Sequence, residues 1–310
     1  YQAGYSNVSG EENVTLGVQA SYTSSQAKYL TAVGYQAAYS LGNAWHNTAI
    51  GHTALRSTTT GEFNVAVGRQ ALYSNTTASN NTAVGYQSLY ANTTGADNSA
   101  FGKYALVSTN TGSFNTAFGS NALYSNTTAS NNTAVGYQAG YSFTTGGYST
   151  VMGYQAAQNA TAGGTVAIGH SSAKNNTGAG ITAVGSNALV TNTSGTSSTG
   201  IGTNALNDNT TGSSNVALGR DALYSNTTAS NNTAVGYQAG YSNTTGTQNT
   251  AIGRASLLRN TTANLNTAVG DYSLFGNTTG AKNVALGAAA LESNTTASHN
   301  TTVGYQAGKN

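Results

Sequence analysis

The sequence predicts an all-β protein, a parallel β-solenoid of about eighteen coils. Three observations predict this fold: a repeat of seventeen residues, strand-like alternation of apolar and small residues, and turn-forming residues between the alternating stretches. Helical solenoids need longer repeats, mostly above about 30 residues. The shorter unit found here has room for two short strands and two turns, which together make one coil of a β-solenoid.

A glycine that follows an apolar residue marks the repeat, and we name these residues the repeat glycines. They recur at a constant interval, as from Gly17 to Gly34, except for two steps that are one residue shorter, both between Gly153 and Gly185. Because the units fill the chain, we expect a single repeat domain over residues 1–310, as a segment of a longer protein. The repeat glycines are Gly17, Gly34, Gly51, Gly68, Gly85, Gly102, Gly119, Gly136, Gly153, Gly169, Gly185, Gly202, Gly219, Gly236, Gly253, Gly270, Gly287 and Gly304.

A short strand is predicted immediately before each repeat glycine. The third residue before the glycine is Thr or Val, except for Ser99; the second is usually Ala, and the first is always apolar. Successive side chains of a strand point to opposite faces, so the Thr or Val and the apolar residue share one face and the Ala lies on the other. Because Ala permits close approach, we expect another chain to pack against the Ala face. The glycine is expected at a bend or at a positive φ.

Each coil is expected to hold a second strand after the glycine, in stretches such as QALYS. The stretches NTTAS and NTTGS that follow have the composition of turns. Their Asn also begins an N-glycosylation sequon, so two interpretations stay open: a glycan acceptor, or a stacked ladder of Asn and Thr side chains, which we favour. We name these residues the turn asparagines: Asn75, Asn92, Asn126, Asn192, Asn209, Asn226, Asn243, Asn260, Asn277 and Asn294.

Sixteen of the 20 tyrosines fall in two stripes, one and five residues after the repeat glycine or its expected place. Tyrosine ladders commonly pack between stacked elements or across an interface, and this interpretation is favoured over stacking on the sugar rings of a glycan. The first stripe is Tyr1, Tyr35, Tyr86, Tyr137, Tyr154, Tyr237 and Tyr305, and the second is Tyr5, Tyr22, Tyr39, Tyr73, Tyr90, Tyr124, Tyr141, Tyr224 and Tyr241.

The composition argues against an enzyme and against a catalytic, cofactor or metal site. Charged residues make up 6% of the chain, against about 25% in typical soluble domains. Paired-carboxylate chemistry needs two neighbouring acids, and a zinc site needs three or four ligands within bonding distance. A metal contact between chains at His46 and His52 stays a minor alternative. The acids are Glu11, Glu12, Glu62, Asp97, Asp208, Asp221, Asp271 and Glu292, and the histidines are His46, His52, His170 and His299.

Net charge and cysteine content limit the partners. The net charge is +2 and the basic residues are scattered, so they form no basic patch of the kind that binds nucleic acid. No apolar run approaches the roughly 20 residues of a membrane span, so no membrane insertion is expected. The absence of cysteine excludes disulfides and thiolate ligands.

Four strings resemble the head repeats of trimeric autotransporter adhesins, which centre on Asn-Ser-Val-Ala-Ile-Gly and a small residue. They are NVAVGRQA (64–71), TVAIGHSSA (165–173), NVALGRDA (215–222) and NVALGAAA (283–290). The recurring NTAVGYQAL form also resembles repeats of phage tail fibres and bacterial surface fibres. The resemblance implies a left-handed β-roll, a homotrimer and an extracellular attachment role. The repeat in this chain is longer than is usual in the adhesins.

These observations together predict a structural role. We expect an extracellular fibre segment, a rigid spacer or adhesin rod on a cell surface, a secreted filament or a virion. Its first partner is expected to be a second copy of itself, and a cell-surface glycan or host surface is a further candidate. The alternative is a glycan-binding receptor segment that uses the tyrosine stripes.

Overall fold

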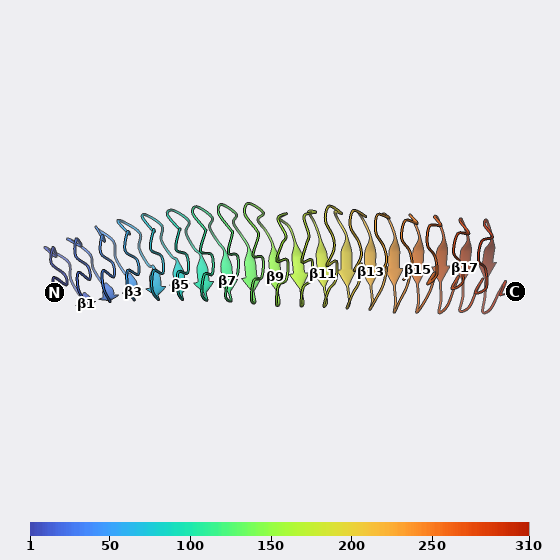
Figure 1. The fold of residues 1–310 in the computed structure, drawn as a ribbon, viewed down its shortest axis with the longest axis horizontal. Coiled ribbons are helices and arrows are strands. Elements are labelled where there is room, and N and C mark those ends of the chain that lie inside the picture. Colours follow the sequence, from blue (N-terminus) through green and yellow to red (C-terminus); the bar gives the residue numbers. More distant parts are fainter. Residues whose placement is uncertain (310) are drawn as a thin grey trace. The chain divides into compact units, whose positions relative to one another are not determined.

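The chain folds into short strands that are joined by turns, one strand in each coil (Figure 1). The structure is a computed structural model and describes residues 1–309, which contain no helix. The strands are β1 (Val14–Leu16), β2 (Thr31–Val33), β3 (Thr48–Ile50), β4 (Val65–Val67), β5 (Thr82–Val84), β6 (Ser99–Phe101), β7 (Thr116–Phe118), β8 (Thr133–Val135), β9 (Thr150–Met152), β10 (Val166–Ile168), β11 (Thr182–Val184), β12 (Thr199–Ile201), β13 (Val216–Leu218), β14 (Thr233–Val235), β15 (Thr250–Ile252), β16 (Thr267–Val269), β17 (Val284–Leu286) and β18 (Thr301–Val303).

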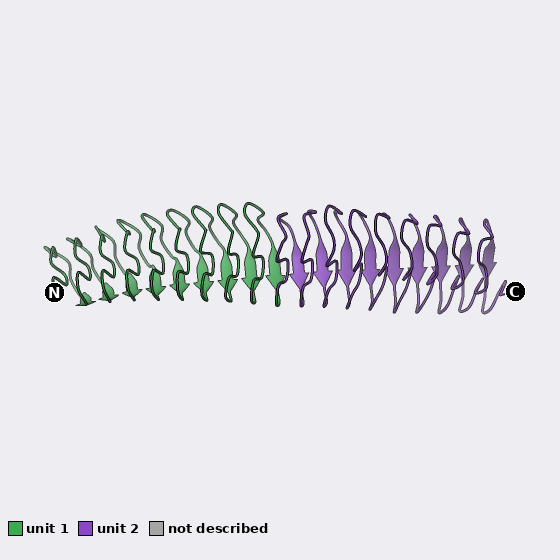
Figure 2. Ribbon diagram, viewed as in Figure 1, with its two compact units in different colours: residues 1–154 green, residues 155–310 purple. Residues whose placement is uncertain are grey.

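Two compact units divide the chain, Tyr1–Tyr154 and Gln155–Asn310 (Figure 2). In the first unit each of the strands β1 to β9 pairs in parallel with the next, and in the second unit β10 to β18 do the same. The register is one repeat, so that Val65 pairs with Thr82 and Val67 with Val84. Each unit is therefore a parallel β-solenoid, as the period of the sequence predicts.

The short coils keep this pairing. Val166 of β10 pairs with Thr182 of β11, a step one residue shorter than elsewhere, and Ile168 pairs with Val184. The missing residue therefore falls in the turns and leaves the strand register intact. Turns tolerate such a deletion because their backbone faces solvent and packs less tightly than the strands.

The expectation of a second strand in each coil is wrong. The stretch after the repeat glycine is a series of turns, in which residues two and four after the glycine have left-handed backbone: Gln70 has φ 59° and Leu72 has φ 49°. A strand requires a negative φ at every residue, so QALYS cannot extend. The bend instead turns the Leu side chain inward, where Leu72, Leu89 and Leu106 are fully buried.

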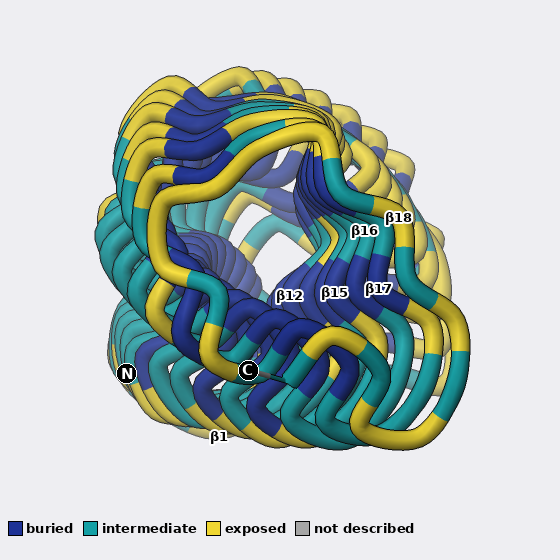
Figure 3. The backbone as a smooth tube through the Cα atoms, turned by 90° about the vertical axis from the view of Figure 1, so that its right-hand side faces the viewer, coloured by how far each residue is buried: buried dark blue, intermediate teal, exposed yellow. Residues whose placement is uncertain are grey.

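The two faces of the strand are the reverse of what we expected. The central alanines, such as Ala66 and Ala83, are fully buried inside their own coil, whereas the first and third residues of each strand face outward. No second chain can therefore pack on the Ala column. The second unit has the same pattern: Ala251 and Ala285, the central residues of β15 and β17, are buried, and Figure 3 colours buried residues dark blue along the tube.

The interior is narrow, and side-chain volume is exchanged within a coil. In two coils a small residue four after the glycine is accompanied by a large one three positions later, Ala38 by Leu41 and Gly140 by Phe143. All four residues lie inside the coil, and Leu41 and Phe143 are fully buried. A close-packed core tolerates such swaps when the total volume is kept.

The repeat glycines lie where adjacent coils approach most closely. Gly219 has φ +139°, and a Cβ built on it would lie 2.5 Å from the carbonyl oxygen of Gly236 in the next coil. The same positive φ and the same contact recur at Gly102 and Gly253. The strict glycine column therefore has two causes, a backbone conformation that favours glycine and the absence of room for a Cβ.

Candidate functional site

The turn asparagines form a ladder inside each unit. Asn226 donates through Nδ2 to Oδ1 of Asn209 in the preceding coil at 2.8 Å and to the carbonyl oxygen of Ala229 in its own coil at 3.0 Å. Its own Oδ1 accepts from Nδ2 of Asn243 at 3.0 Å. The links continue in the second unit from Asn176 to Asn294. The ladder interpretation of these residues is confirmed.

A second asparagine ladder precedes the strands, and we name its members the strand asparagines. Oδ1 of Asn215 accepts from the backbone N–H of Asn232 in the next coil at 3.0 Å, and Nδ2 of Asn215 donates to the carbonyl oxygen of Ala229 at 2.7 Å. The strand asparagines are Asn13, Asn47, Asn64, Asn81, Asn98, Asn115, Asn132, Asn215, Asn232, Asn249, Asn266, Asn283 and Asn300. The two ladders meet because Ala229 also accepts from Asn226.

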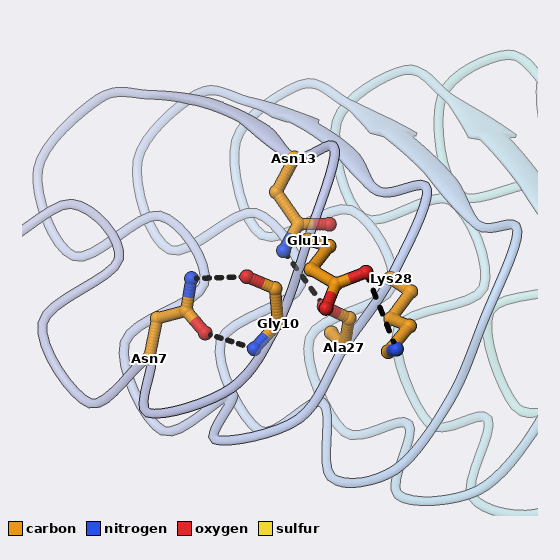
Figure 4. Close-up of polar contacts among 6 residues, drawn as sticks. All are labelled: Asn7, Gly10, Glu11, Asn13, Ala27 and Lys28. Atoms are coloured by element: carbon orange, nitrogen blue, oxygen red, sulfur yellow. Dashed lines mark hydrogen bonds and ion pairs between the residues drawn. The ribbon is translucent and has the colours of Figure 1, made fainter.

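Figure 4 shows the corresponding contacts near the start of the chain. Asn7 occupies the place of a turn asparagine, donates to the carbonyl oxygen of Gly10 at 3.2 Å and accepts from its N–H at 2.7 Å. The strand asparagine Asn13 donates to the carbonyl oxygen of Ala27 in the next coil at 2.7 Å. Asn7 is exposed and Asn13 half-buried at this end, whereas the corresponding Asn75 and Asn64 farther along the chain are fully buried. A buried polar group is tolerated when it is hydrogen-bonded, so these ladders let a polar sequence occupy an interior.

Breaks in the turn ladder leave amide oxygens without a partner. Oδ1 of Asn92 and Oδ1 of Asn126 are buried and accept no hydrogen bond. The next coil has Thr109 after Asn92 and the buried Phe143 after Asn126, where a turn asparagine would otherwise donate. The sequence analysis did not predict that Thr109 and Phe143, standing where Asn recurs, would leave a buried amide oxygen without a hydrogen bond. The absence of Asn at these two places is nevertheless visible in the repeat.

Burial decides which sequon asparagines a glycan can reach. The turn asparagines Asn126 and Asn226 are fully buried and hydrogen-bonded. Asn131 and Asn231 also begin sequons of the form Asn-Asn-Thr, and both are exposed. Our sequence analysis missed these two residues, although the Asn-x-Thr pattern was present.

We expect an oligosaccharyltransferase that accepts folded substrates to modify Asn131 and Asn231 and to leave Asn126 and Asn226 unmodified, because only exposed amides are accessible. Peptide mass spectrometry measures the occupancy of each site. In the denatured chain all four asparagines should become acceptors. A glycan on Asn126 or Asn226 of the folded protein would contradict the buried ladder.

The outward face of the strands carries a row of apolar side chains beside a row that is mostly threonine in each unit, and we name it the outer strand face. It consists of the first and third residues of every strand, with Thr or Val first and Val, Ile, Leu, Phe or Met third, apart from Ser99 at the start of β6. Phe118 is 58% exposed, Leu218 44% and Ile252 39%. A contiguous apolar row of this kind is unusual on a monomer and commonly marks an interaction site.

The tyrosines of the second stripe stack on one another between adjacent coils. Tyr73 and Tyr90 have ring centroids 5.2 Å apart and an interplanar angle of 12°. The Arg56 guanidinium takes the place of a ring in this stripe, 5.2 Å from the centroid of Tyr39 and 5.7 Å from that of Tyr73. Sugar stacking needs an open ring face, and each stacked tyrosine has at least one face covered by its neighbour.

The acids and histidines are dispersed, and several acids are paired with a basic residue. Glu11 pairs with Lys28 at 3.5 Å (Figure 4), and Glu292 pairs with Lys309 at 2.9 Å. Among residues 1–309 no group of three or more His, Asp or Glu residues is placed to hold a metal ion. The His46 ring stacks on Tyr29 and Phe63, with centroids 4.5 and 4.9 Å away.

Two carboxylates have shifted pKa values with different causes. Asp271 accepts two hydrogen bonds from Arg254, at 2.9 and 2.8 Å, and this contact lowers the pKa of Asp271 below its usual value. Burial raises the pKa of Asp208, and the Asp208 charge in turn raises the pKa of Tyr224. Neither shift arises from a second carboxylate, because the contact with Arg254 causes the first and burial the second.

A hollow in the last coil holds about 490 Å³. Its lining includes Leu291, Asn294, Thr295 and Thr302 and contains no titratable group. A hollow lined in this way offers hydrogen bonds and apolar contact but no general acid or base to activate its hydroxyl groups.

Residues 1–309 contain no helix with the length and apolar character that crossing a bilayer requires. No protein-family model matches the chain, and no curated protein sequence matches it.

Proposed function

We propose that this chain is a structural, non-enzymatic segment of an extracellular fibre, a spacer or adhesin rod that associates with copies of itself. The observation that carries the proposal is the outer strand face. It places apolar side chains in solvent at every coil, and burying them against identical faces would remove that exposed area from water. Most homo-oligomers are closed and symmetric, and a left-handed homotrimer, as the adhesin resemblance implies, is the arrangement we propose.

Two further features support a mechanical role over a chemical one. Two ladders of hydrogen-bonded amides run beside the Ala and Leu core and hold each coil to its neighbours. Charged residues are few, and several of them lie in surface ion pairs. Each further coil of this kind lengthens the chain and adds no catalytic or binding site. Attachment to a cell or host surface is part of the same proposal.

The test is the oligomeric state and its dependence on the outer strand face. A single chain has a mass of 31.2 kDa, and sedimentation equilibrium is expected to give three times that value. Lys in place of Ile252 would put an unpaired charge in the interface at a cost of several kcal/mol, so we expect association to weaken at least about 100-fold.

Thr245→Lys is the matched control, because Thr245 is exposed in a turn away from the outer strand face. This variant adds the same charge and is expected to associate like the original chain. A wild-type protein that stays monomeric at every concentration, or a Thr245→Lys variant that dissociates like Ile252→Lys, would refute the proposed interface.

A further inference from the structure

Pairs of tyrosines on adjacent coils lie with their rings parallel and close. Ring centroids are 5.2 Å apart in Tyr224–Tyr241 and 4.8 Å apart in Tyr124–Tyr141, with interplanar angles of 14° and 7°. The same arrangement holds for Tyr5–Tyr22, Tyr22–Tyr39, Tyr73–Tyr90 and Tyr137–Tyr154. Parallel rings at this separation are offset, so that the edge of one ring lies over the other.

These rings are also within reach of small molecules. Tyr124, Tyr141, Tyr224 and Tyr241 are each partly exposed. The phenols lie on the outer side of the turns, whereas the asparagine ladders occupy the interior. A small oxidant can therefore reach both members of a pair without opening the coil.

We propose that the stacked tyrosines are sites of oxidative cross-linking, at which dityrosine bonds join adjacent coils. The co-reactant is hydrogen peroxide used by a haem peroxidase. Each of the two phenols loses one electron and one proton and becomes a phenoxyl radical. The radicals couple through a new C–C bond between their ortho carbons, and the two ortho protons move to the phenol oxygens. The peroxide takes up the two electrons and two protons and gives two molecules of water.

The composition of the chain favours this outcome over the usual competing reactions. Cysteine, methionine and tryptophan side chains are the common alternative sites of oxidation, and the chain has no Cys, one Met and one Trp. Neither Met152 nor Trp45 is among the stacked residues of the tyrosine pairs. A phenoxyl radical in a pair therefore has its neighbouring tyrosine as the nearest partner.

The fold also specifies which tyrosines cannot couple. Arg56 separates Tyr39 from Tyr73, and Val107 separates Tyr90 from Tyr124, so the members of these two combinations lie two coils apart. The structure thus assigns a pattern of cross-links and not a general tendency of exposed tyrosines. This pattern of cross-links is expected whether or not the chain assembles into a fibre, because both members of each pair belong to one chain.

The experiment treats the folded full chain with peroxidase and hydrogen peroxide and follows dityrosine fluorescence and peptide masses. We expect linked peptides that contain Tyr73–Tyr90, Tyr124–Tyr141 and Tyr224–Tyr241, each lighter by two hydrogen atoms. The chains should keep the mass of a single chain on a denaturing gel. Tyr90→Phe should reduce the Tyr73–Tyr90 product to background and leave Tyr224–Tyr241 unchanged.

Tyr148→Phe is the matched control, since Tyr148 is 79% exposed and is not a member of a stacked pair in the described chain. It should leave all three products unchanged. The proposal is overturned if folded and denatured chains give the same products, if Tyr39–Tyr73 forms as readily as Tyr73–Tyr90, or if the linked pairs are absent.

Discussion

Gly219→Ala is expected to destabilise the second unit by more than about 4 kcal/mol, a loss typical of severe backbone or packing damage. The added Cβ would lie 2.5 Å from the carbonyl oxygen of Gly236, and the φ of +139° is unfavourable for any residue with a side chain. The neighbouring coil cannot move away, because the strand bonds and both asparagine ladders cross the same gap, the turn ladder through the bond from Asn243 to Asn226. Thermal unfolding followed by circular dichroism measures the loss.

Gly180→Asn provides the matched control in the same unit. Gly180 also has a positive φ, +69°, but it is exposed, and the nearest atom to a Cβ there would be 3.8 Å away. Asn adopts this left-handed conformation readily, so the variant should unfold within about 1 kcal/mol of the original chain. Equal losses for the two variants would show that close approach of the coils is not what requires glycine at the repeat position.

Asn226→Ala is expected to cost about 3–5 kcal/mol, the sum of unpaired buried groups and a cavity. The change removes the donor to Oδ1 of Asn209 and the acceptor for Nδ2 of Asn243. It also removes one of the two donors to the carbonyl oxygen of Ala229. Native-state hydrogen exchange should show the loss of protection centred on the coils around residue 226, since each coil of a solenoid contacts only its neighbours.

Asn231→Gly tests whether burial is the cause. Asn231 is exposed and has φ 63°, which glycine adopts without strain, so only a solvent-facing side chain is removed. We expect a change within about 0.5 kcal/mol, the usual range for surface substitutions. If Asn226→Ala were as mild as this control, the interior ladder would contribute nothing to the stability of the unit.

The repeat glycines and the strand before them were predictable from the sequence, because both are fixed by local backbone geometry. The orientation of the strand was not. Alternation shows that Ala66 and its neighbours Val65 and Val67 face opposite ways, but it does not show which face lies inside. Leu72 already fills much of the narrow interior. Only a small side chain such as that of Ala66 fits beside it, so Val65 and Val67 face outward.

The turn after the glycine was misread for a related reason. Gln70 and Leu72 have left-handed backbone although neither residue favours it, because the closure of the coil outweighs the preference of a single residue. The ladder of turn asparagines was inferred from composition, and its buried position was not. The apolar outer strand face became evident only when the structure placed Ala66 and Ala83 on the inside.

The direction of the bonds between coils has a consequence for how such a chain bears load. Within each unit the backbone and amide hydrogen bonds join one coil to the next, so a pull along the stacking direction stretches one interface at a time. Coils would detach singly, and each would release one repeat of sequence, about 55–60 Å of extended chain. Force is then absorbed in small successive steps, so that the chain extends gradually where a sheet loaded in shear would fail at once.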